Sequence, residues 1–133
     1  MDFSKINRRN LIIISIYIIG FSIGTISHSI DIVLKGFLGY TFAPFILNVF
    51  WTSLIFLDPL TILLLLFKYR TAIWLAAIIM ILDISINLIY GFYTSQISIL
   101  LGLTTQIPFG IFVFFTVNRL YQSNSIKHFL TAK

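Results

Sequence analysis

Four long apolar stretches, separated by short polar breaks, dominate the pattern of hydrophobic and polar positions along the chain. They cover about residues 11–30, 45–67, 71–93 and 97–117. Each is rich in Ile, Leu and Phe without strict alternation, and each reaches the roughly 20 apolar residues that a helix needs to cross a hydrocarbon core. Because a helix satisfies its backbone hydrogen bonds internally, as lipid demands, the pattern predicts a bundle of four transmembrane helices.

The composition indicates a membrane protein with one domain. Of the 133 residues, 59% are hydrophobic and only 10% are charged, and the mean hydropathy is +1.02. A soluble domain carries about 25% charged residues. No linker or composition shift divides the chain, so we expect residues 1–133 to form a single all-α integral membrane domain. Cysteine is absent, which excludes disulfides, thiolate metal sites and cysteine nucleophiles.

The cationic residues predict the orientation of the helices. All but one of the nine lysines and arginines precede the first stretch, separate the second from the third, or follow the fourth, and only Lys35 lies on the other side. Because lysine and arginine collect on the cytoplasmic side, both termini are expected in the cytoplasm of a multi-pass protein of the cell (inner) membrane. The scatter of these residues also argues against a nucleic-acid partner, despite the net charge of +5.

The first stretch has an alternative interpretation as a cleaved signal peptide. Lys5, Arg8 and Arg9 precede an apolar run, and Ser22-Ile23-Gly24 resembles a cleavage site. The run is longer than the usual apolar region of about 7–15 residues and the site lacks alanine, so we expect a retained helix.

Polar residues recur near the middle of three stretches. Asp58 lies in the second, Asp83 in the third, and Gln106 with Pro108 in the fourth. An aspartate at the centre of a transmembrane helix costs about 2.5–3.5 kcal/mol, so such residues face the bundle interior, a partner or water. We expect the partner of Asp58 to come from another helix, with Asp83, Asn87 and Gln106 as the candidates.

Helical periodicity places further residues beside the two aspartates. At 100° per residue, Asn87 and Tyr90 share the face of Asp83, and Trp51 shares the face of Asp58. Pro59 removes a backbone donor from the second helix, which frees the carbonyl of the fourth residue before it and favours a kink. Two interpretations stay open: a cavity for a ligand or ion, and a purely structural contact between helices.

The outer end of the first stretch carries a second polar group. His28, Asp31 and Lys35 are three and four residues apart on one face, where they form either an acid–base pair or, as we favour, a solvated cap. No metal site is expected, because His28 and His128 lie on opposite sides of the membrane. The connection from Asp31 to Pro44 is too apolar for a free loop and is expected to lie along the interface or fold back as a lid.

The sequence lacks the nucleotide-binding, nucleophile-elbow and zinc-protease motifs, and no cofactor is expected. Any enzyme of this sequence would be an intramembrane isomerase that uses carboxyl groups as acid and base. In the first stretch Gly20 and Gly24 form a GxxxG spacing, which is a packing signal and leaves a homodimer possible.

The sequence resembles the EXPERA superfamily, which includes the emopamil-binding and sigma-2-type sterol-ligand proteins. The residues that carry the likeness are His28 with Asp31, Phe56 to Pro59, and Ile107-Pro108-Phe109, and the likeness spans residues 15–117. It implies four helices with cytoplasmic termini and a pocket for a sterol or an amine. The sequence departs from the family where the glutamate of the second helix would fall on Ser53, so only Asp31 carries over as a matching acid.

These observations favour a protein that binds a hydrophobic small molecule, such as a lipid, sterol or isoprenoid, in an intramembrane pocket. The expected ligand-binding residues are Asp58, Asp83, Asn87, Gln106, His28, Asp31, Trp51 and Tyr90. A small proton-coupled exporter that works as a homodimer and a structural or accessory membrane subunit are the alternatives.

Overall fold

The computed structural model describes residues 7–123, and every element in this part of the chain is helical. The helices are α1 (Arg8–Lys35), α2 (Phe45–Phe67), α3 (Tyr69–Thr94) and α4 (Ile97–Tyr121). Each helix is long and apolar enough to cross a membrane, which confirms the prediction of an all-α protein with four membrane-spanning helices. The helix α1 extends beyond the predicted apolar stretch at both ends.

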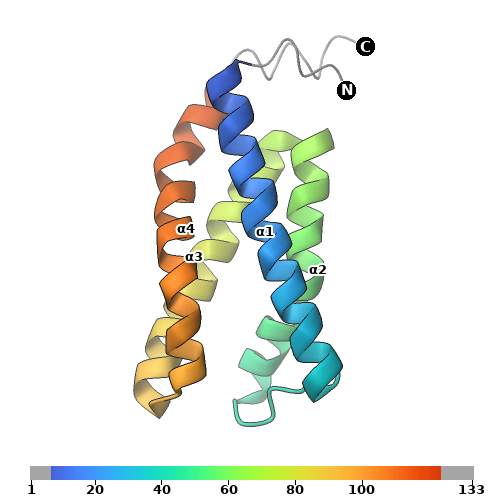
Figure 1. Cartoon of the computed structure of the whole chain (residues 1–133), viewed down its shortest axis with the longest axis vertical. Coiled ribbons are helices and arrows are strands. Elements are labelled where there is room, and N and C mark those ends of the chain that lie inside the picture. The colour runs from blue at the N-terminus through green and yellow to red at the C-terminus, as the bar shows by residue number, and fades with distance from the viewer. Residues whose placement is uncertain (1–6, 124–133) are drawn as a thin grey trace.

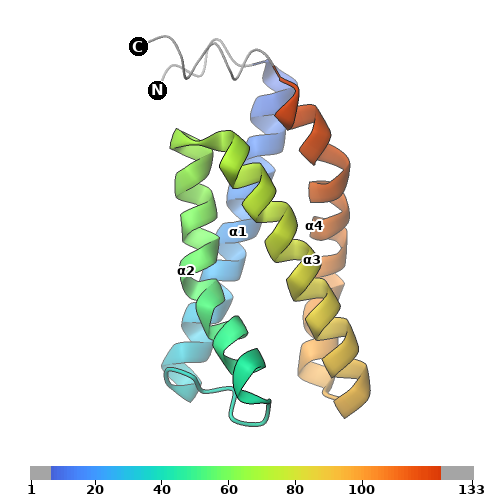
Figure 2. The same ribbon diagram turned by 180° about the vertical axis from the view of Figure 1, so that it is seen from behind.

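The four helices form two hairpins, α1 with α2 and α3 with α4 (Figure 1). A single residue, Lys68, separates α2 from α3 and lies at the same end of the bundle as the start of α1 and the finish of α4. We call this the terminal end, and we call the opposite end, which holds residues 36–44 and 95–96, the loop end. The hairpins lie close together at the terminal end and diverge towards the loop end, as the reverse view also shows (Figure 2).

A cluster of aromatic side chains joins α1 to α4 in the terminal half of the bundle. The hydroxyl of Tyr17, which is fully buried, donates a hydrogen bond to the carbonyl oxygen of Val113 at 3.1 Å. One turn further along, the rings of Phe21 and Phe109 meet edge to face with their centroids 5.4 Å apart. A Cβ atom on Gly20 would collide with the ring of Phe109, so glycine permits this close approach. The two helices are therefore held together at one end only.

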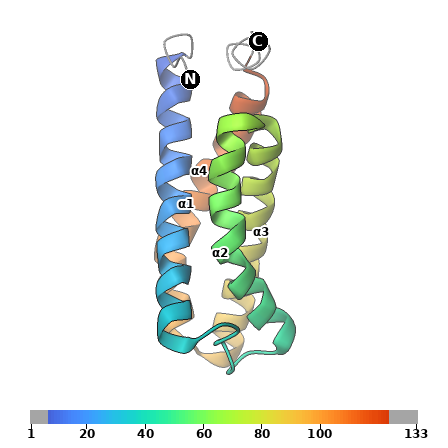
Figure 3. The same cartoon turned by 90° about the vertical axis from the view of Figure 1, so that its right-hand side faces the viewer.

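The helix α2 remains helical through Pro59 and bends near its middle (Figure 3). Proline inside a helix removes one backbone hydrogen bond and is a common cause of such a bend. Next to it, Asp58 packs against Gly24 of α1 so closely that a Cβ atom on Gly24 would collide with the carboxyl oxygen. Both glycines of the GxxxG spacing thus contact helices of the same chain.

The connection of residues 36–44 folds back over the loop end of the bundle, which is one of the two arrangements expected for the segment from Asp31 to Pro44, while residues 31–35 belong to α1. The side chain of Asn48 accepts a hydrogen bond from the backbone nitrogen of Tyr40 at 3.2 Å and donates one to the carbonyl of Leu38 at 2.7 Å. The hydroxyl of Tyr40 donates to Oδ2 of Asp31 at 2.9 Å. These three bonds fix the connection to both α1 and α2.

We expect Tyr40→Phe to lower the free energy of unfolding by about 1 kcal/mol, since it deletes one hydrogen bond to a half-buried carboxylate. Tyr93→Phe is the matched control, because Tyr93 is 88% exposed. Thermal unfolding of both variants in mild detergent measures the difference. Equal stability of the two variants would show that the bond to Asp31 does not hold the connection in place.

Candidate functional site

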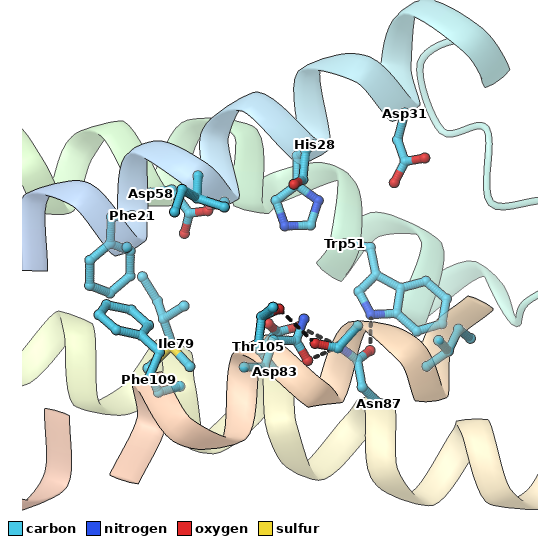
Figure 4. Close-up of a pocket in the computed structure, with 18 of the residues that line it drawn as sticks. Phe21, His28, Asp31, Trp51, Asp58, Ile79, Asp83, Asn87, Thr105 and Phe109 are labelled. Atoms are coloured by element: carbon cyan, nitrogen blue, oxygen red, sulfur yellow. Dashed lines mark hydrogen bonds between the residues drawn. The ribbon is translucent and has the colours of Figure 1, made fainter. Parts of the chain in front are cut away.

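A cavity of about 580 Å³ lies between the two hairpins, and all four helices and the connection 36–44 contribute to its wall (Figure 4). Seven of the eight predicted ligand-binding residues line it, and Tyr90 is the exception. The hydroxyl of Tyr90 instead donates to the carbonyl of Phe42 at 2.9 Å, and its ring packs against Trp51. Tyr90 therefore supports the wall from behind and holds the connection against α3.

Asn87 is the centre of a hydrogen-bond network on the α3 side of the cavity. Its carbonyl accepts a bond from Nε1 of Trp51 at 2.8 Å, and its amide nitrogen donates to Oδ1 of Asp83 and to Oε1 of Gln106, both at 2.9 Å. Asn87 and Asp83 are each only 6% exposed. The network connects α2, α3 and α4, and it uses both N–H donors of the Asn87 amide group and one hydrogen bond to its oxygen.

Asp58 lies on another side of the cavity and differs from Asp83 in one important respect (Figure 4). It is only 4% exposed, yet its carboxyl group forms no hydrogen bond with any residue in the range 7–123. The prediction that Asp83, Asn87 or Gln106 would be its hydrogen-bonding partner is wrong. The reason is that the backbone of α1 at Gly24 packs against Asp58 and the Asn87 network forms on a separate wall.

At the loop end of the cavity, α1 contributes a second polar cluster. Nζ of Lys35 forms an ion pair with Oδ1 of Asp31 at 2.6 Å, and Nδ1 of His28 lies 3.5 Å from the hydroxyl of Tyr40. Burial, followed by the hydrogen bond to Asp31, raises the pKa of Tyr40 above its ordinary value, so this hydroxyl remains a donor at physiological pH. The prediction of a polar cap fits the ion pair of Asp31 and Lys35, whereas the imidazole of His28 faces the cavity (Figure 4).

The end of the cavity nearest the terminal end is apolar. Phe21, Phe109, Ile79 and Met80 form its floor, and Phe21, Ile79 and Phe109 are seen together at one side of the close-up (Figure 4). Polar groups therefore occupy the loop end and the middle of the cavity, and hydrocarbon occupies its floor. This distribution suits an amphipathic ligand rather than a uniformly apolar or polar one.

Sequence reasoning missed several residues of the site. His28 and Asp31 were predicted to bind the ligand, but Gly20 and Gly24 were interpreted only as a packing signal and Lys35 only as part of a cap, and all five residues line the cavity. They are spaced four, four, three and four residues apart, so they form one continuous face of α1. That periodicity in the sequence could have shown that the two glycines and the polar cluster of His28, Asp31 and Lys35 share one face of α1.

Buried polar residues at the start and middle of α2 were also missed. Asn48, Thr52 and Thr61 are buried, and the hydroxyl of Thr61 donates to the carbonyl of Leu57 at 2.8 Å. Threonine of this kind is not distinctive in a transmembrane sequence, because its hydroxyl can bond to its own helix.

The side chains that line the site can bind a ligand and can transfer protons. Within residues 7–123 no three His, Cys, Asp or Glu side chains gather where they could hold a metal ion. The site offers carboxyl, amide, imidazole and phenol groups in an apolar cavity, and these groups recognise hydrogen-bond donors on a ligand.

We expect Asn87→Ala to lower the free energy of unfolding by about 1–3 kcal/mol, because Trp51 and Gln106 lose their partners in a buried site. Asn118→Ala is the control, since Asn118 is exposed on α4. Unfolding of the detergent-solubilised variants by sodium dodecyl sulfate measures the difference. A loss no larger than that of the control would mean that the network does not stabilise the bundle.

No protein-family model, curated protein or solved structure matches this chain, so its resemblance to the EXPERA superfamily stays a prediction.

Proposed function

We propose that the protein is a membrane-embedded binding protein for a lipophilic small molecule whose polar group donates hydrogen bonds, such as an amine or an alcohol. The observation that carries the proposal is the carboxyl group of Asp58, which is buried, faces the cavity and has no hydrogen-bond partner among residues 7–123. The carboxyl group opens onto the cavity, and in an apolar, largely enclosed place a carboxyl group needs hydrogen-bond donors to offset the loss of bulk water. A ligand that donates to Asp58 supplies such a bond.

The size and the lining of the cavity support the same function. Pockets for small ligands enclose about 300–1,000 Å³ and combine an apolar wall with a few polar groups that fix the ligand's orientation. The cavity of about 580 Å³ fits this description. In the proposed complex the polar group of the ligand lies beside Asp58, and its apolar body lies over Phe21 and Phe109.

We further propose that the terminal end of the bundle faces the cytoplasm. Among residues 7–123, five cationic residues lie at that end or next to it, and only Lys35 lies at the loop end. These five are Arg8, Arg9, Lys68, Arg70 and Arg119. Such an excess of Lys and Arg marks the cytoplasmic side of membrane proteins.

The absence of cysteine from the sequence makes the orientation directly measurable. We expect Phe37→Cys, at an exposed position of the connection 36–44, to react with a membrane-impermeant maleimide in intact cells. Lys68→Cys, in the turn between α2 and α3, should react only after the cells are permeabilised. The reverse pattern of labelling would overturn the proposed orientation.

For the binding function, we expect Asp58→Asn combined with Asp83→Asn to reduce the amount of co-purified lipophilic compound at least about tenfold, as the loss of a charge-assisted hydrogen bond implies. Mass spectrometry of organic extracts from equal amounts of purified protein measures this. Ser85→Ala is the control, because Ser85 lies on an exposed part of α3 outside the cavity.

Gly24→Ala tests the same binding function while keeping both carboxyl groups. The added methyl group collides with the carboxyl of Asp58 and displaces it, so retention of the ligand should again fall. Gly110→Ala is the matched control, because its new methyl group collides with the side chain of Ile84 at a position that does not line the cavity. Unchanged retention in the folded double-asparagine variant would overturn the binding function and leave the aspartates with a role in assembly alone.

A further inference from the structure

We infer that the ligand is a single-chain amphiphile that enters the cavity sideways from the bilayer, through the seam between α1 and α4, and leaves its chain in that seam. This inference rests on the proposed binding function and adds the class of ligand and its route. The route follows from where the helices touch, where the cavity wall is exposed, and which other sides of the cavity are closed.

The helices α1 and α4 share the smallest contact among the main packed pairs of helices. Their contact lies in the terminal half, where Tyr17 bonds to Val113 and Phe21 packs against Phe109. Beyond Phe21 the two helices diverge (Figure 1). No hydrogen bond or ring contact connects them in the loop half within residues 7–123.

The opening of the cavity, which we call its mouth, lies between α1 and α4 in the loop half, where the two helices separate. Ile19 and Ile23 of α1 line the cavity, yet they are 59% and 57% exposed. Ser98 and Thr105 of α4 also line the cavity and are also exposed. Residues that both line a cavity and meet the outside form its rim, so one edge of the rim belongs to α1 and the other to α4.

The remaining sides are closed by packed groups. Between α1 and α2, Asp58 packs against Gly24, and between α2 and α3, Trp51 bonds to Asn87. At the loop end, the connection 36–44 covers the cavity and is held by the bond from Tyr40 to Asp31. An opening between two transmembrane helices faces lipid, so the open side of the cavity gives access from the hydrocarbon region of the bilayer.

The rim defines what can pass through it. Its α1 edge is hydrocarbon and its α4 edge carries hydroxyl groups, so an amphiphile can slide its apolar chain along Ile19 and Ile23 while its polar group passes Ser98 and Thr105. Inside, that polar group reaches Asp58. Because the hydrocarbon chain of the ligand can remain between α1 and α4, the volume of the cavity does not limit the length of that hydrocarbon chain.

Fluorescence of Trp51 reports arrival in the cavity. Trp51 lines the cavity and is only 4% exposed, and Trp74→Phe leaves it as the sole tryptophan of the chain. In phosphatidylcholine vesicles, brominated dodecylamine and brominated octadecylamine should both quench Trp51. Octadecylamine should quench at least as strongly as dodecylamine at equal mole fraction in the membrane. Weaker quenching by octadecylamine than by dodecylamine would overturn the inference that the hydrocarbon chain of the ligand lies between α1 and α4.

Two engineered cross-links test the route, both formed with a reducible bifunctional reagent in the Trp74→Phe background. The first joins Ile23→Cys to Thr105→Cys across the mouth. The second joins Asn10→Cys to Ser123→Cys at the terminal end, where the native side chains are 2.7 Å apart. We expect the first cross-link to slow quenching at least tenfold and its reduction to restore the rate, and we expect the second to leave the rate unchanged.

Adding the amine before or after the cross-link is formed distinguishes two effects of the cross-link: closing the entrance of the cavity, and preventing binding inside it. When the amine is bound before the cross-link across the mouth is formed, quenching should persist after dilution with empty vesicles, because the ligand is trapped. Equal quenching rates with and without that cross-link would overturn the lateral route and leave the binding function standing. Absence of quenching in the protein without cross-links would overturn the binding function itself.

Discussion

The amide group of Asn87 is the interaction on which the arrangement around the cavity depends. It connects α2, α3 and α4 through Trp51, Asp83 and Gln106, and it satisfies these polar groups in a place where water is scarce. The helix α1 takes no part in this network. It reaches the other helices through Gly24 against α2 and through Tyr17 and Phe21 against α4. The cavity is the space that remains between the α1–α2 hairpin and the α3–α4 hairpin, which the Asn87 network joins on one side and which α1 and α4 join near the terminal end.

The face of α1 that lines the cavity explains why Asp58 has no hydrogen-bond partner among residues 7–123. Small residues, Gly20 and Gly24, occupy the positions where α1 crosses its neighbours, so the backbone of α1 comes close to α2 and α4. A glycine offers no side-chain donor, and the backbone nitrogens in the middle of a helix are already bonded within it. On that side Asp58 therefore meets a surface that provides no hydrogen bond, and its carboxyl group opens onto the cavity. One turn further along, the same face presents His28 to the cavity.

The sequence was sufficient for the helices and for the positions of the polar groups along them, because lipid imposes a minimum length on each apolar stretch and a high cost on each exposed charge. It was not sufficient for the pairing of side chains. Asp58 and Asp83 lie near the middle of their helices, but whether two such groups meet depends on how the helices rotate and cross, which periodicity does not define. Tyr90 shows the same limit, since it shares a helical face with Asn87 and yet lies behind the wall, bonded to Phe42.

The contrast between the two buried aspartates bears directly on function. Asp83 accepts a hydrogen bond from Asn87 of the same helix and thereby belongs to the network that joins α2, α3 and α4. Asp58 forms no hydrogen bond with any residue in the range 7–123, so it has no such part in holding the helices together. Asp58 instead faces a cavity whose floor is apolar and whose open side lies between α1 and α4. Because no residue in the range 7–123 bonds to this carboxyl group, the proposed function assigns its hydrogen-bond partner to a ligand.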